Sequence, residues 1–349
     1  MRVAVFSDVH WCQNSSIVRS RGNKYSARLE NLIKSMNWME RCAFDHGCGV
    51  IICCGDFFDS SQLNAEEISA LQEVEWAPLP HVFITGNHES NISSLEFSTS
   101  DIFKLLPNSV VFSTPEHYFI DGTDVEFCFL PYITERDRKP LSEYFPVQTT
   151  KRIIFSHNDI KDIQYGPFIS TEGFEVSDIE NNCDLMFNGH IHHCSYVTDK
   201  IIHSGNLTGQ NFTEDAFKYE HCMQIVDTDT LSVDFFENPN AYNFYKIDAT
   251  DITCDAELAY KFNTLKYNSV ITLKVKQQYK KLAETLLETN KVKVPESRLI
   301  IEQDLSSITE DINSDIIEGV DHLKQFEAYA LSNIGNNDIV IEELNNIMR

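Results

Sequence analysis

Short apolar runs alternate with polar or helical stretches over residues 1–250 of the chain. This alternation predicts a layered domain of mixed strands and helices. Helices are expected where apolar residues recur at three- and four-residue spacing, at residues 26–45 and 64–75. Each expected strand ends at or beside a polar turn, and the strands are residues 2–7, 50–54, 81–85, 125–130, 152–156, 185–188 and 201–204. A hairpin formed by residues 223–226 and 231–236 would close the sheet.

The pattern changes around Asn238-Pro239-Asn240, which suggests a first domain of residues 1–240. Residues 241–308 then predict a small β-α-β cap, with strands at 269–276 and 298–302 and a helix at 278–289. Residues 309–349 are acidic and predict a tail of two helices, separated by a break at 333–337. Such a tail would dock either on its own domain or on a partner.

Length and composition are those of an ordinary globular protein. The 349 residues are enough for one large domain and a smaller one, with 42% hydrophobic and 23% charged residues. No apolar stretch reaches the ~18 residues of a membrane span, and the N-terminus has no signal-peptide layout. The ten cysteines form no CxxC pair, which fits reduced thiols. A cytoplasmic protein is expected, in a bacterium or a phage-infected host.

Net charge constrains the partners. A net charge of −25 repels polyphosphate, so a nucleic-acid function needs local basic patches, metal ions or a basic partner. One basic run qualifies as a candidate DNA contact and comprises Arg19, Arg21, Lys24, Arg28 and Lys34, with Glu30 as the single acid inside it. A second cluster is Arg136, Arg138 and Lys139. Either set could equally be a solvated surface. The acidity argues against tight autonomous DNA binding, but not against DNA as a substrate.

Potential metal ligands follow five of the expected strands directly. In chain order they are Asp8 and His10, Asp56 with Asp59, Asn87 and His88 with Glu89, His157, and His190 with His192. Open α/β sheets bind ligands beyond the carboxyl ends of their strands, so these side chains can converge. Taken singly, each motif has an ordinary structural explanation; Asp59, for example, could be a helix N-cap. The ordered set of five is hard to explain by chance.

This mixture of side chains suits a pair of transition-metal ions. Aspartate and imidazole together favour Mn, Fe or Zn over Mg alone. Two cations about 3.5–4 Å apart need a bridging carboxylate, and together they clamp the oxygens of an in-line displacement at phosphorus. Glycines at positions 55, 86 and 189 permit the tight turns and close backbone approach that such a site requires. The sequence therefore predicts two-metal phosphoester hydrolysis.

The motifs resemble those of the calcineurin-like metallophosphoesterases over residues 1–236. The resemblance implies an α+β fold, a four-layer α/β/β/α sandwich with a small C-terminal α/β cap and a helical tail. It implies one metal site formed by Asp8, His10 and His192, a second formed by Asn87, His157 and His190, and Asp56 as the bridge. His88 would face the scissile phosphate as the catalytic group. Asp59 and Glu89 would support the ligands from outside, although the family usually has aspartate where Glu89 stands.

Within that family, three features resemble the SbcD-type nucleases of double-strand-break repair. The segment from Ile201 to Asn206, followed by Phe212-Thr213-Glu214, is similar to their Gly-Ser…Phe-x-Glu segment, with Asn206 in place of serine. The early basic run and the cap with its tail are the other two, and the compact length resembles the bacteriophage members. The resemblance implies a Mn²⁺-dependent DNA exonuclease and endonuclease, a cap that contacts DNA, and a homodimer. It also implies that the tail docks on an SbcC-type coiled-coil, SMC-like ATPase subunit.

Two other functions stay open at this point. A stand-alone phosphoesterase could act on small phosphate esters or nucleotides, with the cap and tail covering its pocket. A non-catalytic subunit of a repair complex is the third possibility, although the complete ligand set argues against it.

Overall fold

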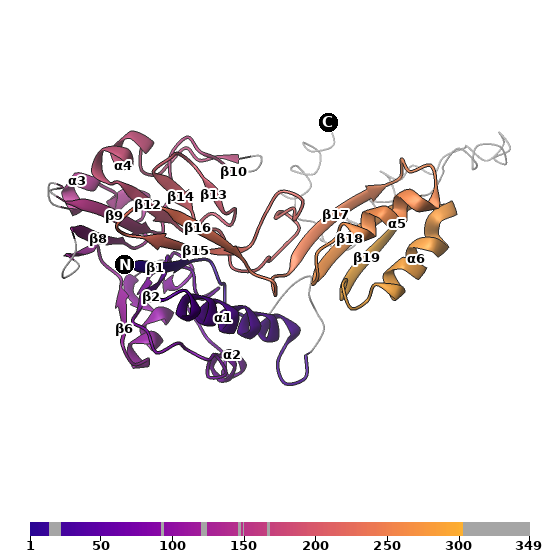
Figure 1. The fold of residues 1–349 in the computed structure, drawn as a ribbon, viewed down its shortest axis with the longest axis horizontal. Helices are drawn as coiled ribbons and strands as arrows, with labels where there is room; N and C mark the ends of the chain where they lie inside the picture. Colours follow the sequence, from indigo (N-terminus) through magenta and orange to yellow (C-terminus); the bar gives the residue numbers. More distant parts are fainter. Residues whose placement is uncertain are drawn as a thin grey trace, which may run out of the picture. The chain divides into compact units, whose positions relative to one another are not determined.

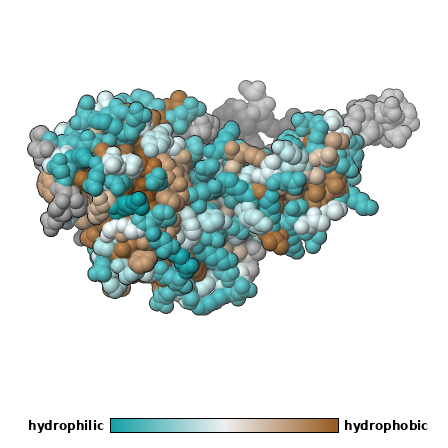
Figure 2. Space-filling model, in the orientation of Figure 1, coloured by the Kyte–Doolittle hydropathy of each residue, from teal (hydrophilic) through white to brown (hydrophobic). Residues whose placement is uncertain are grey.

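The computed structural model describes residues 1–13, 22–91, 94–119, 124–145, 148, 150–165 and 168–302. Residues Met1–Ile301 form one compact unit. Arg19 and Arg21 of the basic run lie outside the described residues, as does the helical tail predicted at 309–349. Among the described helices, none combines the length and the apolarity needed to cross a membrane. The face drawn in Figure 2 is largely hydrophilic, with apolar residues scattered across it.

Two six-stranded sheets form the centre of the fold. The first has the order β16-β15-β1-β2-β3-β6, and β1, β2, β3 and β6 are parallel. Its strands are β1 (Arg2–Phe6), β2 (Cys48–Cys53), β3 (His81–Ile84), β6 (Ser109–Phe112), β15 (Cys222–Asp227) and β16 (Val233–Glu237). The second has the order β13-β14-β12-β9-β8-β7, with β14, β12, β9 and β8 parallel. Its strands are β7 (Glu116–Phe119), β8 (Val125–Leu130), β9 (Lys151–Ser156), β12 (Leu185–Asn188), β13 (Ser195–Tyr196) and β14 (Ile201–His203).

The alternation of side chains along β1 shows how the layers are held together. Val3 and Val5 lie in the apolar core between the two sheets, together with Phe127 and Phe155 of the second sheet. Successive side chains of a strand point to opposite faces, so the neighbours of Val3 and Val5 on β1 pack instead against the helices of the first sheet. Both faces of β1 are therefore buried, which is why this strand reads as a nearly continuous apolar run.

Helices cover the outer face of each sheet and complete the sandwich (Figure 1). On the first sheet these are α1 (Ala27–Asp45) and α2 (Ala65–Leu71), and on the second α3 (Leu141–Tyr144) and α4 (Val176–Asn182). Ser26 caps α1 by accepting a hydrogen bond from the Leu29 N–H, and Asn64 caps α2 in a capping box with Glu67. The four-layer α/β/β/α fold is confirmed.

Shorter elements complete the sandwich and the cap. They are the two-stranded pairs β4 (Ser90–Asn91) with β5 (Ser94–Ser98) and β10 (Gln164–Tyr165) with β11 (Phe168–Ile169), and the 3₁₀ turns at Thr99–Leu105, Glu135–Asp137 and Gln277–Tyr279. None of these was predicted, and neither were β6, β7, β13, α3 and α4. A four-residue strand with an exposed pattern, such as β7, carries too little alternation to stand out from a loop.

The cap is larger than the predicted β-α-β unit. It contains β17 (Asn243–Ala249), α5 (Asp255–Asn263), β18 (Ser269–Lys276), α6 (Lys280–Thr289) and β19 (Glu296–Glu302), and its three strands have the order β17-β18-β19. The prediction was wrong in omitting β17 and α5. Along β17, Lys246 and Asp248 are exposed while Tyr245, Ile247 and Ala249 are buried. That alternation is the strand period, so the sequence did contain the signal.

Candidate metal centre

All five predicted motifs come together at the carboxyl ends of parallel strands. From the first sheet, β1 leads to Asp8 and His10, β2 to Asp56, and β3 to Asn87. From the second sheet, β9 leads to His157, and β12 leads to His190 and His192. Their side-chain atoms form interlinked groups, described below. Both sheets therefore build the centre, and packing between the sheets fixes the distance between its two sides.

The backbone at this centre is held in an unfavourable conformation. Asp8, His10, Asp56 and His190 have φ angles of 52°, 47°, 48° and 73°, in the left-handed region that non-glycine residues rarely adopt. Each such residue costs on the order of 1 kcal/mol or more, and residues of this kind cluster at functional sites. Four of the seven predicted ligand residues share the feature, so the surrounding structure holds them against their local preference.

Two glycines are required by close approach. A Cβ at Gly55, which has a φ of +89°, would collide with the ring of His157. A Cβ at Gly86 would collide with the carboxylate of Asp56. Any side chain at either position would push the centre apart, which accounts for glycine before Asp56 and before Asn87.

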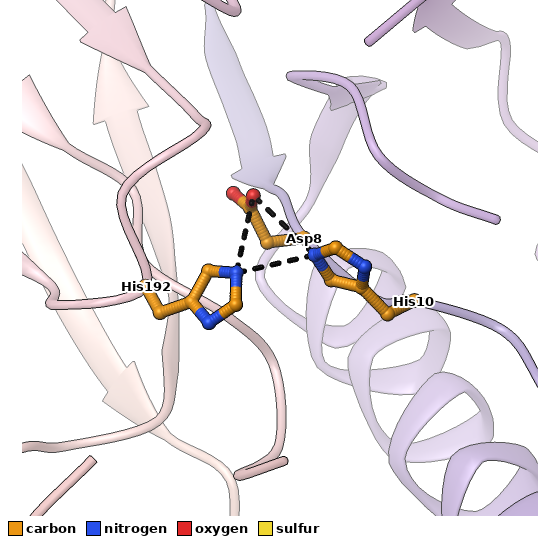
Figure 3. Close-up of side chains that lie close together, drawn as sticks. All are labelled: Asp8, His10 and His192. Atoms are coloured by element: carbon orange, nitrogen blue, oxygen red, sulfur yellow. Dashed lines mark hydrogen bonds and ion pairs between the residues drawn. The ribbon is translucent and has the colours of Figure 1, made fainter. Parts of the chain in front are cut away.

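The first group of side chains comprises Asp8, His10 and His192 (Figure 3). The Nε2 atoms of His10 and His192 are 3.2 Å apart, and they lie 3.8 and 3.9 Å from Oδ1 of Asp8. Asp8 is fully buried and also accepts a hydrogen bond from the backbone N–H of His190. Three potential ligand atoms therefore surround one point at the end of β1.

The second group comprises Asp56, Asn87, His157 and His190. Oδ1 of Asn87 is 3.0 Å from Nε2 of His157 and 3.0 Å from Nδ1 of His190. Oδ2 of Asp56 lies 3.1 Å from Nε2 of His157 and 3.9 Å from Nε2 of His10, a member of the first group. This one carboxylate oxygen thus stands between the two groups, where a bridging ligand would stand.

When neutral, each of the four histidines turns a nitrogen lone pair toward the centre. In each ring, the nitrogen facing away from the centre contacts a group that can only accept. These contacts are His10 Nδ1 with Asp59 at 3.0 Å, His192 Nδ1 with Glu214 at 2.8 Å, His157 Nδ1 with the Cys54 carbonyl at 2.7 Å, and His190 Nε2 with Asp159 at 3.2 Å. In the neutral ring the proton therefore sits on the outer nitrogen, and a lone pair faces inward.

Lone pairs facing carboxylate and amide oxygens repel each other unless a cation lies among them. This donor set of carboxylate, imidazole and amide fits divalent transition-metal ions, and anchoring the outer nitrogen is how proteins orient metal-binding histidines. The residues present therefore fit two metal ions.

The electrostatics point the same way. Burial opposes a charged His10, but hydrogen bonds to Asp59 and Asp8 outweigh it and raise the pKa of His10 to about 10. Burial also lowers the pKa of His157, but the opposite effects, chiefly that of the nearby charge of Asp56, are together larger. The pKa of His157 is therefore raised to about 9. The pKa of Asp56 is held low despite its burial, because these histidines surround it. Protons occupy the centre when metal ions do not, so the two compete.

Comparison with known proteins identifies the family. A family model described as calcineurin-like phosphoesterase matches residues 1–194, more than half of the chain. The chain belongs to this family. The crystal structure of TT1561 of Thermus thermophilus is 11% identical, with a TM-score of 0.40, and the match covers 68% of this chain and 98% of that one. So distant a similarity adds nothing to the argument. No curated protein sequence matches the chain.

In this phosphoesterase, His88 lies at the rim of the centre. Its side chain is 42% exposed, and its Nε2 is 4.0 Å from Oδ2 of Asp56. Its Nδ1 donates to the backbone carbonyl of Asp59 at 3.0 Å, which turns Nε2 toward the centre. His88 also forms a potential metal-binding group with His10 and Asp56. Its exposure contrasts with the burial of His10 and Asp56, and it suits a group that meets the substrate better than a structural ligand.

The two predicted supporting acids have clear positions. Asp59 contacts the ring of His10 through its carboxylate and the ring of His88 through its carbonyl. Glu89 is fully buried and accepts hydrogen bonds from the backbone N–H groups of Phe57, Phe58 and Gly86 at 2.6, 3.1 and 2.6 Å. It fastens the loop after Asp56 to the loop before Asn87. The longer glutamate side chain therefore keeps a positioning function in place of the family's usual aspartate.

Two residues at this centre were missed as supporting groups. Glu214, noted only as part of a resembling segment, contacts His192, and Asp159 contacts His190. Asp159 follows His157 by two residues, so an acid near a ligand histidine was the available signal. Glu214 is 22 residues from His192 in sequence, and only the folded chain shows that they meet.

The described members of the basic run do not form an open patch. Arg28 is 3% exposed and donates to the backbone carbonyls of Gly209 and Val9. Its guanidinium therefore holds the loop after β1 in place, and the burial of Arg28 does not fit the predicted DNA contact there. Lys24 is exposed but forms an ion pair with Glu73, which offsets its charge. Arg138 of the second cluster is also largely buried and pairs with Glu135.

Proposed function

We propose that this phosphoesterase is a Mn²⁺-dependent DNA nuclease, the nuclease subunit of an SbcCD-like recombination and double-strand-break repair complex. The proposal rests on one observation. The two groups of potential metal ligands meet at Asp56, and His88 lies beside them. Hydrolysis of a phosphodiester needs an anion site next to a proton donor, and this arrangement provides both.

In the proposed centre, Asp8, His10 and His192 hold one cation, and Asn87, His157 and His190 hold the other. Asp56 would be shared by the two cations, because its Oδ2 lies 3.9 Å from His10 of the first group and 3.1 Å from His157 of the second. Two divalent cations, when bound, supply Lewis-acid stabilisation of the charge that develops on the phosphate oxygens. Mn²⁺ is proposed because the donor set admits it and the SbcD-type resemblance implies it.

His88 acts as the proton donor in this proposal. Because its Nδ1 proton is donated to the Asp59 carbonyl, only Nε2 can reach a bound phosphodiester. As the oxygen of a water molecule forms a bond to phosphorus and the bond to the 3′ oxygen breaks, Nε2 would give its proton to that departing oxygen. Positioned groups of this kind contribute roughly 10²–10⁴-fold to rate.

The distribution of charge supports DNA as the substrate. Residues 1–240 contain sixteen Lys and Arg against thirty-five Asp and Glu, whereas residues 241–302 contain ten against eight. The cap is therefore the part of the described chain that least repels a polyanion. Lys246, Lys274 and Lys276 alternate with the buried residues of β17 and β18, so they lie on the sheet face opposite α5 and α6. Asp248 shares this face and pairs with Lys274 at 3.9 Å, so Lys246 and Lys276 are the proposed DNA contacts on it.

One segment, residues 206–216, contacts both the metal centre and the cap. The backbone N–H of Asn206 donates to the His192 carbonyl, and Glu214 contacts the His192 ring. Two residues later, the Ala216 N–H donates to the carbonyl of Phe244 in β17. The segment that resembles the SbcD-type nucleases is thus the one that links His192 to the cap, which favours this subfamily over a phosphoesterase with an unrelated cap.

The partner proposals rest on sequence and charge. An acidic nuclease need not bind duplex DNA strongly if a coiled-coil ATPase holds it, and the tail at 309–349 is the proposed docking segment. Dimerisation through helices of the nuclease domain, including α2, is proposed on the resemblance.

A comparison of substrates tests the proposed function. Purified protein is incubated in Mn²⁺ with linear duplex DNA, hairpin DNA and small phosphate esters, with and without a coexpressed coiled-coil ATPase. We expect DNA cleavage that chelation abolishes and that exceeds hydrolysis of the small esters. Hydrolysis of small esters without cleavage of DNA would instead establish the stand-alone phosphoesterase, which the acidity of residues 1–240 favours. Protein that binds metal but hydrolyses neither would be a non-catalytic subunit.

A further inference from the structure

A cavity opens beside the metal centre on the side of the second sheet. It has a volume of about 560 Å³, within the range of small-ligand sites, and its lining includes His190 and His192. Each of these histidines belongs to a different ligand group of the proposed centre. A phosphoester held between the two groups therefore has its substituent at the mouth of this cavity.

Aromatic rings line the cavity. The rings of His193 and Tyr219 lie against each other with centroids 4.3 Å apart and an interplanar angle of 32°. Tyr196, which is 54% exposed, contributes a third ring. His193 follows His192 directly in the chain, so the turn that places one histidine at the metal centre places the next in the cavity wall. The motif that forms the metal site thus also forms part of this wall.

Polar side chains line the cavity together with these rings. Gln164, Ser195 and Glu214 contribute to the same lining. A flat ligand with π faces and hydrogen-bonding edges matches such a wall better than a purely apolar substituent does. Nucleobases have this character, and stacking on aromatic side chains is how proteins hold unpaired bases without reading sequence.

We propose that this cavity is a nucleobase subsite, in which Tyr219 stacks on the base of the nucleotide whose phosphate occupies the metal centre. The inference rests on the proposed nuclease function and adds to it. It assigns the terminal nucleotide of a frayed DNA end as the ligand, because a base inside a duplex is already stacked and cannot enter a pocket. Tyr219 is a binding residue in this proposal, and it takes no part in proton transfer.

Calorimetric titration of the Mn²⁺-loaded protein tests the subsite without relying on turnover. The probes are deoxyadenosine 5′-monophosphate and deoxyribose 5-phosphate, which carry the same phosphate and differ in the base. We expect the nucleotide to bind about ten-fold more tightly, an increment in the range of base–aromatic stacking. Tyr219→Leu should reduce this preference to two-fold or less, whereas Tyr219→Phe should keep it.

Two controls make the result specific. Deoxyribose 5-phosphate should bind equally to the wild type and both variants, which shows an intact phosphate site. Tyr260→Leu, at a 68% exposed tyrosine of α5, should change nothing. Equal affinity of the wild type for the two probes, or a full preference in Tyr219→Leu, would overturn the subsite.

The experiments distinguish a failure of the nuclease proposal from a failure of the subsite proposal. If DNA is not cleaved but the base preference and its loss in Tyr219→Leu are observed, the subsite stands and the substrate is a free nucleotide. If DNA is cleaved and the preference is absent, the nuclease stands and the subsite does not.

Discussion

At the residue scale, the orientation of the histidines matters more than their number. The sequence identifies His10, His157, His190 and His192 as candidate ligands. It does not show which nitrogen of each ring faces the centre, because that depends on acceptors elsewhere in the fold. Three rings present Nε2 and His190 presents Nδ1, each fixed by the acceptor behind it. These outer acceptors are as much a part of the site as the ligands.

Replacing His88 separates proton donation from metal binding. In His88→Gln, we expect turnover to fall by roughly 10²–10⁴-fold, since the proton donor is gone. Metal content, measured by mass spectrometry of the dialysed protein, should stay at the wild-type value because His88 is not a proposed ligand. A variant that has lost a metal ion would show instead that the group formed by His88, His10 and Asp56 is a true metal site.

Glu214 is expected to act through His192. Its carboxylate fixes the proton on Nδ1 of that ring, and in Glu214→Gln the amide can present its N–H to the same atom and disturb the tautomer. We expect affinity at the site of Asp8, His10 and His192 to fall by about 10–100-fold, as is typical when such supporting groups are lost. Mn²⁺ titration measures this. Glu220→Gln, at an exposed glutamate nearby, is the matched control, and an equal effect of the two changes would contradict this function of Glu214.

At the element scale, the strands that carry the ligands were predictable, whereas the edge strands, the helices on the second sheet and part of the cap were not. Strands β1, β2, β3, β9 and β12 are buried on both faces and end in ligand residues, so apolar runs and motifs mark the same positions. In the cap, no functional motif follows the strands, so only the apolar pattern marks them. Strand β17 also begins directly after the expected domain boundary at residue 240. The contacts of Glu214 and of the buried Arg28 could not be predicted, because each joins segments that are distant in the chain.

The open sheet face of the cap should carry the salt-sensitive part of DNA binding. Lys246→Glu with Lys276→Glu reverses two charges on this face, and we expect weaker duplex binding and a shallower dependence of log Kd on log salt, by about one unit per lost phosphate contact. Hydrolysis of a small phosphate ester should not change. Lys280→Glu with Lys281→Glu makes the same charge change on helix α6. If the helix variant weakens DNA binding as much as the sheet variant, the sheet face is not the contact.

At the scale of the whole molecule, charge is divided unevenly. Residues 1–240 are strongly acidic, the cap is slightly basic, and residues 303–349 carry ten acids against two basic residues. Such a chain is poorly suited to hold duplex DNA alone. A partner that binds DNA would supply the missing attraction and confine the nuclease to sites where the partner is bound.

Removing the tail tests this dependence. Deletion of residues 309–349 should abolish co-purification with the coiled-coil ATPase, because the proposed docking helices are gone. Mn²⁺-dependent hydrolysis should persist, since every proposed ligand lies within Met1–Ile301. Retention of the complex by the truncated chain would place the docking surface elsewhere.

The two-metal centre is the claim on which the rest depends, and anomalous diffraction from a crystal of the protein in Mn²⁺ tests it most directly. We predict two anomalous peaks about 3.5–4 Å apart, one among Asp8, His10 and His192 and the other among Asn87, His157 and His190, with Asp56 between them. A single peak, or a peak coordinated by His88 in place of His192, would contradict the account.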